Sequence, residues 1–229
     1  MRIITRNIKS HHFQYLLFTL CFIFAFAVIS PAIKQTAFSD RFINYVHRIY
    51  GEATMARILK WQDLIIENMD RKEMEKLNAV NSYFNKIAQV SDLDNYKQQD
   101  YWATPLELIA LNGGDCEDIA IAKYFTLKKL NVEEKKLWLT YVRAYTKNRI
   151  VPHLVLTYYT SPNAEPFILD NIMPDILSAS KRKDLKPTYS FNVSGLWAAK
   201  ERERGKHDGG ANRVYKWKDL LERMEDEGF

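Results

Sequence analysis

The chain contains very little cysteine. Only two of its 229 residues are cysteines, and one of these, Cys21, lies inside an apolar stretch near the N-terminus. If that stretch acts in export, Cys116 is the only thiol in the exported part, so an intramolecular disulfide there is excluded. A lone thiol in an oxidising compartment is either idle or reactive, and the residues around Cys116 decide between these two interpretations.

The chain also has little net charge outside its first residues. The formal net charge is +5 at pH 7, and Arg2, Arg6 and Lys9 supply three of these charges, which leaves +2 for the rest. A charge this small predicts no nucleic-acid partner. Internal repeats and low-complexity linkers are also missing, while the hydrophobic content is 47% and the charged content 27%. These features predict one globular domain.

Residues 13–29 are almost continuously apolar, interrupted only by Gln14 and Thr19, and basic residues precede them. This pattern is typical of a secretory signal. Residues 25–27 fit an Ala-x-Ala cleavage site and residues 30–32 offer a second one, so we expect a mature N-terminus near Val28 or Ile33. The stretch is longer than a usual signal core of about 7–15 residues and nearly reaches the ~20 residues of a membrane span.

An uncleaved N-terminal anchor therefore stays open as an alternative. We divide the chain into residues 1–32, a signal peptide or N-terminal anchor, and residues 33–229, the folded domain. Both alternatives place that domain outside the cytoplasm.

The periodicity of the domain changes along its length. Apolar residues at helical spacing predict helices over residues 38–90, with breaks at Gly51 and near Asp70. Thr104, followed by proline and then Glu107, predicts a capped helix that ends before Gly113.

Asp115 is then expected to cap a buried helix from residue 116 to about residue 130. Runs rich in β-branched and aromatic residues follow and predict strands at 137–142, 153–159, 166–170 and 188–193. A terminal helix is expected over residues 214–224. Helices followed by an antiparallel sheet predict the α+β class.

Three residues of this layout could form a nucleophilic site. Cys116 begins a helix, where the macrodipole favours thiolate. His153 lies on a predicted strand and Asp170 ends the next, so antiparallel pairing could bring both side chains to the helix start. Each residue alone has an ordinary structural explanation: a small core thiol, a satisfied strand histidine, or a turn aspartate. The combination is more specific, because no other histidine lies in strand-like sequence after the cysteine.

Three acids surround the thiol and create a physical difficulty. Asp115, Glu117 and Asp118 oppose thiolate formation, since a unit charge about 4 Å away contributes about 1 kcal/mol in water and several times more beside protein. A divalent cation held by carboxylate oxygens would compensate, and Ca²⁺ suits flexible oxygen ligands outside the cell. The alternative is that Asp115 caps the helix and the other two acids occupy its first turn.

Two segments carry a family resemblance. Residues 101–107, which read Tyr-Trp-Ala-Thr-Pro-Leu-Glu, and residues 113–124, which begin Gly-Gly-Asp-Cys-Glu-Asp, resemble the bacterial transglutaminase-like cysteine proteinases, in particular the periplasmic proteases of biofilm-forming bacteria. The resemblance is dense from Trp102 to Asp170. It implies a papain/transglutaminase-like α+β fold, in which a helical N-terminal part and the nucleophile helix pack on an antiparallel sheet.

The resemblance also assigns roles. It implies a catalytic triad of Cys116, His153 and Asp170, and a calcium site formed by Asp115, Glu117 and Asp118. It further implies a periplasmic protease that cuts the N-terminal region of a large surface adhesin beside a pair of alanines and so disperses a biofilm. An inner-membrane receptor for cyclic di-GMP would sequester the enzyme. These implications rest on likeness alone.

Other functions remain open at this point. A cell-wall amidopeptidase or a transglutaminase would use the same triad on another amide, and a binding module could keep the fold without activity. The backbone N–H of Cys116 is a natural oxyanion donor. The indole of Trp102 is a candidate second donor or simply a core side chain.

Overall fold

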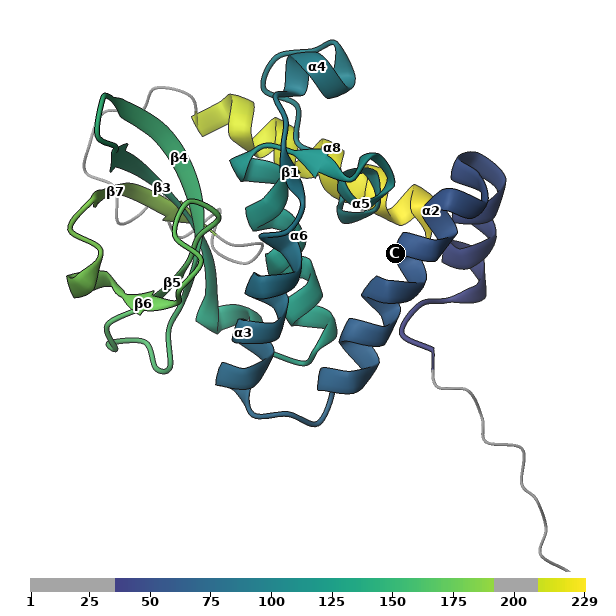
Figure 1. Ribbon diagram of the computed structural model, residues 1–229, viewed down its shortest axis with the longest axis horizontal. Coiled ribbons are helices and arrows are strands. Elements are labelled where there is room, and N and C mark those ends of the chain that lie inside the picture. The colour runs from purple at the N-terminus through teal and green to yellow at the C-terminus, as the bar shows by residue number, and fades with distance from the viewer. Residues whose placement is uncertain (1–35, 192–209) are drawn as a thin grey trace, which may run out of the picture. The chain divides into compact units, whose positions relative to one another are not determined.

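Helices form the first part of the domain and a sheet the second (Figure 1). The computed structural model describes residues 36–191 and 210–229. The apolar stretch 13–29 and the end of the strand expected at 188–193 lie outside the described residues. Among the residues that are described, no helix is both long and apolar enough to cross a membrane.

Two long helices build the N-terminal part. Helix α2 (Asp40–Asn68) starts at Ser39, whose side chain accepts a hydrogen bond from the backbone N–H of Phe42. Gly51 has φ 74° and ψ −171°, so the helix is kinked there, as the sequence predicts. A turn around Asp70 leads into α3 (Glu73–Phe84). One face of α2 is buried through Phe42, Val46, Ile58, Trp61 and Ile65.

The expected helical region ends earlier than residue 90. After Phe84 the chain forms a short strand, β1 (Ala88–Gln89), which pairs in parallel with β2 (Gly113–Gly114). The helical region ends early for a tertiary reason. The backbone of β2, which lies 25 residues further along the chain, supplies the hydrogen-bond partners of β1. Helix α4 (Asp92–Tyr96), which Ser91 caps, was likewise not expected.

Two capping boxes fix the next elements. Helix α5 (Pro105–Leu111) begins at Thr104, which pairs reciprocally with Glu107 as predicted. Helix α6 (Cys116–Lys129) begins at Asp115, which pairs in the same way with Asp118. Helix α6 is buried over most of its surface, as its sequence predicts, because it contacts α3 and α5 as well as strands β3 and β4.

The sheet is antiparallel and has five strands in the order β6-β5-β4-β3-β7. Its strands follow the predicted ones closely: β3 (Leu137–Tyr145), β4 (Ile150–Tyr158), β5 (Phe167–Leu169), β6 (Leu177–Ser178) and β7 (Leu185–Phe191). Only β6 was unexpected among them, and two residues are too few to give a pattern. Short 3₁₀ turns, η1 (Glu134–Lys136) and η2 (Ala179–Lys181), precede β3 and follow β6.

Both faces of strand β4 are covered. Leu154 and Leu156 belong to the main core together with α6, while Val155 packs in a second cluster with Val142 and Ile168. Residues Ala179 and Leu185 cover that second cluster. This burial on both faces gives β4 its continuous apolar run and also encloses His153, which is 3% exposed.

The C-terminal helix, α8 (Gly210–Glu227), starts four residues earlier than residue 214. It contacts α2 and runs behind α5 and α6 in Figure 1. Phe229, which follows it, stacks on Trp61 with ring centroids 5.4 Å apart. The aromatic contacts of Phe229 with Phe38 and Phe42 extend this packing and join the C-terminus to the first described helix.

Replacing Thr104 with valine tests the link between α5 and the C-terminus. The Thr104 hydroxyl donates to Glu227 Oε1 at 2.7 Å and accepts from the Glu107 N–H. Glu227 is buried, which raises its pKa to about 8. Valine keeps the shape but removes both bonds, so the free energy of unfolding should fall by about 1–3 kcal/mol. Chemical denaturation measures it. Thr146→Val, in an exposed turn, should change it by less than about 0.5 kcal/mol; equal effects would contradict this packing.

Candidate active site

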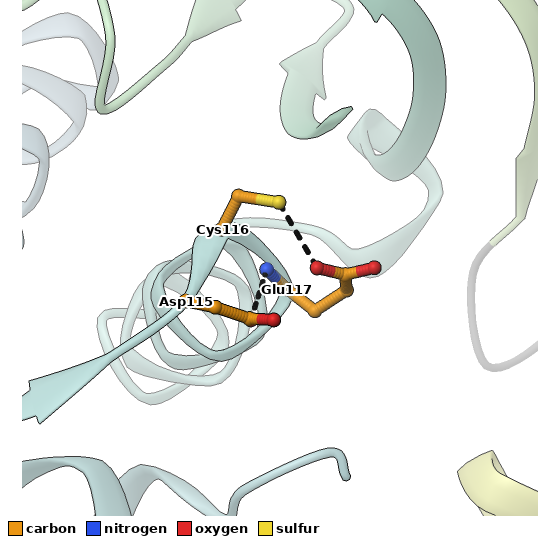
Figure 2. Close-up of side chains that lie close together, drawn as sticks. All are labelled: Asp115, Cys116 and Glu117. Carbon is orange, nitrogen blue, oxygen red and sulfur yellow. Dashed lines mark hydrogen bonds between the residues drawn. The ribbon is translucent and has the colours of Figure 1, made fainter. Parts of the chain in front are cut away.

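Cys116 is the first residue of α6, and Asp115 holds it there. One oxygen of Asp115, Oδ1, accepts hydrogen bonds from the backbone N–H groups of Glu117 and Asp118 at 2.9 and 3.3 Å. Figure 2 shows the first of these bonds, with the Cys116 thiol at the same end of the helix. The capping function expected for Asp115 is therefore confirmed, and it uses only one of the two carboxylate oxygens.

The carboxylate of Asp118 anchors the helix start to the preceding segment. Its Oδ1 accepts from the backbone N–H of Ala103 at 2.7 Å, and its Oδ2 accepts from the N–H of Asp115 at 3.2 Å. Gly114 leaves room for this arrangement, because a Cβ there would lie 2.7 Å from Asp118 Oδ2 and 2.5 Å from a methyl carbon of Leu108. Only glycine fits at this position without displacing the carboxylate.

The Cys116 thiol lies between an acid and the sheet. Its Sγ donates to Glu117 Oε2 at 2.9 Å (Figure 2), and it has a hydrogen bond with the backbone of Leu154, the residue after His153. Burial raises the pKa of the thiol, and the charges of Glu117 and Asp115 raise it further. In the described part of the chain no hydrogen bond joins the thiol to His153. The resting thiol thus keeps its proton and shares it with Glu117.

The register of the sheet brings His153 and Asp170 together. Leu156 pairs with Leu169 across β4 and β5, so Asp170 continues on the face of the sheet that carries His153. His153 Nε2 lies 2.7 Å from Asp170 Oδ1, and both side chains are almost completely buried. This contact agrees with the antiparallel placement expected from the sequence.

Asp170 is held as a carboxylate. Burial alone would raise its pKa, but hydrogen bonds from His153, from the Ile172 N–H and from Arg182 hold the pKa well below its usual range. An ionised carboxylate only accepts hydrogen bonds, so His153 Nε2 must carry the donated proton. In a neutral imidazole the other nitrogen, Nδ1, is then the atom that can accept a proton.

An acidic cluster lies beneath the thiol, and the sequence reveals only part of it. Carboxylate oxygens of Asp92, Asp115 and Asp118 lie within 4.8 Å of one another. Oxygens of Asp115 and Glu117 and the sulfur of Cys116 form a second group within the same distance. Asp92 is the first residue of α4 and was not expected at the site. A serine–aspartate pair that opens a helix is the only sequence signal there, and it indicates capping rather than proximity to Cys116.

Ionisation of the acids in the cluster carries an energetic cost. Burial, followed by the charge of Glu117, raises the pKa of Asp115 to about 9, and burial raises the pKa of Asp118 to about 7. The pKa of Asp92 is also raised, first by burial. Its Oδ1 atom is buried and has no hydrogen-bond partner among the described residues. Convergent carboxylates with an unused buried oxygen fit a hard divalent cation.

A backbone donor for an oxyanion lies at the same helix end. The backbone N–H of Cys116 belongs to the first turn of α6, which has no partners within the helix. The indole N–H of Trp102 is buried and has no hydrogen-bond partner in the part of the chain that the structure describes. Its ring packs against Phe191 and Trp217. Trp102 thus combines core packing of its ring with an indole donor that no described residue uses.

A helix-borne thiol beside a histidine–aspartate pair on an antiparallel sheet defines the class of papain/transglutaminase-like cysteine hydrolases. Comparison with known sequences narrows the class. Residues 42–193 match the family described as bacterial transglutaminase-like cysteine proteinase, BTLCP. The chain belongs to this family and is a cysteine peptidase. No curated protein sequence matches it significantly.

Solved structures of one bacterial protein are similar to this chain. Legionella pneumophila LapG is 40% identical, with a TM-score of 0.66, and the match covers 80% of this chain and 95% of that one. Its calcium-bound form is 41% identical, with a TM-score of 0.65 and coverage of 80% and 97%. An EGTA-treated form is 36% identical, with a TM-score of 0.64 and coverage of 80% and 95%. The α+β fold predicted from the sequence is confirmed by these matches.

The raised pKa of Asp115 makes stability depend on pH. The group loses its proton near the ordinary value of 3.8 in the unfolded chain and near 9 in the folded protein, so the free energy of unfolding falls as the pH rises between these values. Asp115→Asn keeps a capping oxygen and removes the charge. In excess chelator it should melt higher than the parent at pH 8, by about 2–4 °C per kcal/mol of repulsion removed, and lose this advantage towards pH 4.

Thermal unfolding followed by circular dichroism measures the difference. Asp94→Asn is the matched control, because Asp94 lies on the same short helix as Asp92 but is exposed and bonded to Ser91. It should leave the pH dependence unchanged. An Asp115→Asn variant that is less stable than the parent at every pH would mean that its capping geometry outweighs its charge.

Proposed function

We propose that this protein is an exported, calcium-dependent endopeptidase that cuts the N-terminal region of a large surface adhesin beside a pair of alanines. The observation that carries the proposal is the likeness to Legionella LapG, which spans 95% of that chain at 40% identity. The joined His153–Asp170 pair and the acids around Cys116 supply the chemistry such an enzyme needs. Release of the adhesin would disperse a biofilm.

Cys116 is the nucleophile in this mechanism. His153 Nδ1 removes the thiol proton as Sγ attacks the scissile carbonyl carbon, and the resulting imidazolium then protonates the leaving amine. Asp170 accepts from Nε2 throughout, so it fixes the tautomer and stabilises the imidazolium. Water then hydrolyses the thioester, with His153 acting again as the base.

The tetrahedral oxyanion forms next to the start of α6. The backbone N–H of Cys116 points from the first turn of the helix and donates to this oxygen. The Trp102 indole N–H, which is buried and unpartnered among the described residues, is the second donor we propose. Removing one such donor typically lowers kcat by about 100- to 1000-fold.

Calcium would be held by Asp115, Glu117 and Asp118, with Asp92 as a fourth acid. Bound there, it would supply positive charge that offsets the carboxylates raising the pKa of the thiol. Engaging Glu117 would also free the Cys116 proton from its bond to that side chain and leave it for His153. The calcium-bound and EGTA-treated forms of Legionella LapG support this cofactor.

Export and regulation complete the proposal. The basic residues and apolar stretch of the N-terminus support a periplasmic location, with inner-membrane anchoring as the alternative outcome of the same signal. We propose an inner-membrane receptor that senses cyclic di-GMP as the partner that holds the protease away from the adhesin. The support for both partners is the family likeness alone.

Alanine substitutions test the triad. Cys116→Ala and His153→Ala should each abolish cleavage of an adhesin N-terminal fragment that contains an alanine pair, because they remove the nucleophile and the base. Asp170→Ala should keep more activity, since its role is orientation. His47→Ala is the matched histidine control, because His47 is exposed and, among the described residues, forms its one ion pair with Glu52. Gel-based cleavage assays and circular dichroism provide the two readouts.

Two outcomes would contradict the assignment. Undiminished cleavage by folded Cys116→Ala protein would exclude this thiol as the nucleophile. Cleavage of cell-wall peptides with no cleavage of the adhesin fragment would keep the triad and replace the substrate by that of an amidopeptidase. Amine incorporation in place of hydrolysis would indicate a transglutaminase.

Chelation tests the cofactor. Excess chelator should abolish activity, and Ca²⁺ should restore it more readily than Mg²⁺, which requires a tighter octahedral shell and retains its waters. Asp115→Ala, Glu117→Ala and Asp92→Asn should weaken Ca²⁺ binding in calorimetry, while Asp94→Asn should bind like the parent. Asp118→Ala should also bind poorly and lose stability, because it breaks the bond to Ala103. Ca²⁺-independent cleavage with no calorimetric signal would leave these acids as helix-start residues only.

A further inference from the structure

Arg182 occupies the oxygen of Asp170 that His153 does not use. Its Nη2 donates to Asp170 Oδ2 at 2.6 Å, while His153 Nε2 bonds to Oδ1 at 2.7 Å. The arginine is 2% exposed, so the contact is shielded from water. Oδ1 also accepts from the Ile172 N–H at 2.9 Å. Both oxygens of the carboxylate are therefore held, and rotation about its terminal bond would break these contacts.

Arg182 is itself fixed from the other side. Its Nε and Nη2 donate to the two carboxylate oxygens of Asp184 at 3.0 and 2.8 Å. The backbone around it is tied as well, because Leu185 N–H donates to the Arg182 carbonyl and Tyr145 N–H donates to the Asp184 carbonyl. These bonds join the guanidinium to the ends of β3 and β7. A planar guanidinium with two carboxylate partners is a rigid bridge, which the flexible ammonium of lysine does not reproduce.

Other groups around Asp170 hold its backbone and the segment that follows it. Asn85 of α3 donates to the Asp170 carbonyl at 2.8 Å, and Asn81 of the same helix donates to the Pro174 carbonyl at 2.7 Å. Lys123 of α6 donates to the Asn81 side chain and interacts electrostatically with Asp170. None of these groups reaches the carboxylate oxygens by a hydrogen bond, so Arg182 is the side chain that sets the orientation of Oδ2.

We propose that Arg182 is a positioning residue for the reaction, an assignment that rests on the proposed triad. By clamping Oδ2 of Asp170, Arg182 sets the plane of the carboxylate. Because His153 bonds to the other oxygen, Oδ1, this plane in turn sets the direction in which the His153 ring faces Cys116. The clamp also keeps the negative charge of Asp170 in place when the imidazole is neutral. Arg182 touches neither the substrate nor the thiol in this role. It extends the His153–Asp170 pair to four hydrogen-bonded residues, with Asp184 at the outer end.

Kinetics of three variants test the clamp. Arg182→Gln removes the positive charge and the planar guanidinium. Because a misoriented His153 ring affects the chemical step, kcat should fall by about 10- to 100-fold while KM stays within about 2-fold. Arg182→Lys should recover part of the loss. Asp184→Asn leaves Arg182 in place but weakens its anchor, and it should give a smaller decrease. Lys136→Gln, which breaks a charged pair with Glu73 outside this network, is the matched control for losing a cation.

A spectroscopic readout separates positioning from stability. The hydrogen-bonded Nε2–H of His153 should give a downfield proton resonance in ¹⁵N-labelled protein, assigned by its loss in His153→Gln. In Arg182→Gln this signal should broaden or move upfield, and in Lys136→Gln it should not change. A loss of melting temperature without any change in this resonance or in kcat would mean that Arg182 is only structural, and would overturn the proposal.

The outcomes also separate this proposal from the triad itself. Cleavage by Cys116→Ala would remove the triad and the clamp together. Inactive Cys116→Ala and impaired Asp170→Ala, with full kcat in Arg182→Gln, would keep the triad and exclude the clamp. Should Arg182→Gln fail to fold, Asp184→Asn and Arg182→Lys decide, because Asp184 is partly exposed and its substitution leaves the buried charge paired with Asp170. Parental kcat and an unchanged resonance in both would then exclude the clamp.

Discussion

The rest of the site depends on the hydrogen bonds that the buried carboxylate of Asp118 accepts. Its two oxygens accept from the backbone of Ala103 and of Asp115, and so join the segment before α5 to the start of α6. The glycine at 114 is required because the carboxylate passes where a Cβ would lie. A buried anion without partners would be costly, but these hydrogen bonds satisfy the Asp118 carboxylate. They also place Cys116, the residue that follows Asp115. Asp118 thus positions the Cys116 thiol, while its neighbours Asp115 and Glu117 disfavour the thiolate.

The electrostatic surroundings of the site are opposite on its two sides. Acids surround the thiol, and its pKa is raised, whereas Arg182 and Lys123 lie on the side of Asp170, whose pKa is lowered. His153 and Asp170 are therefore already paired in the protein alone, through the Nε2 atom of the histidine. The Cys116 thiol, in contrast, is not arranged to give its proton to His153, because it donates that proton to Glu117. A cation at the acidic cluster would act on this side without rearranging the other.

The sequence predicts what is local and misses what is brought together over distance. The capping boxes at Thr104 and Asp115, the kink at Gly51 and the main strands of the sheet all follow from short patterns, and the structure contains them. Asp92 and Arg182 were not found, because each reaches the site through tertiary packing and neither has a distinguishing spacing to Cys116. The two-residue strands β1 and β6 are too short to produce any periodicity.

Magnitudes explain why the helix end alone cannot activate the thiol. The macrodipole at the start of α6 favours a negative charge by typically 0.3–1 kcal/mol and by at most about 2 kcal/mol. One carboxylate about 4 Å away opposes it by about 1 kcal/mol in water and about 4 kcal/mol near a protein surface. Glu117 is in direct contact with Sγ and Asp115 is its other neighbour, so the acids prevail over the dipole. A helix start that carries this many carboxylates is therefore suited to a nucleophile that depends on a bound cation, and the acids that fix its position are the same groups that would bind it.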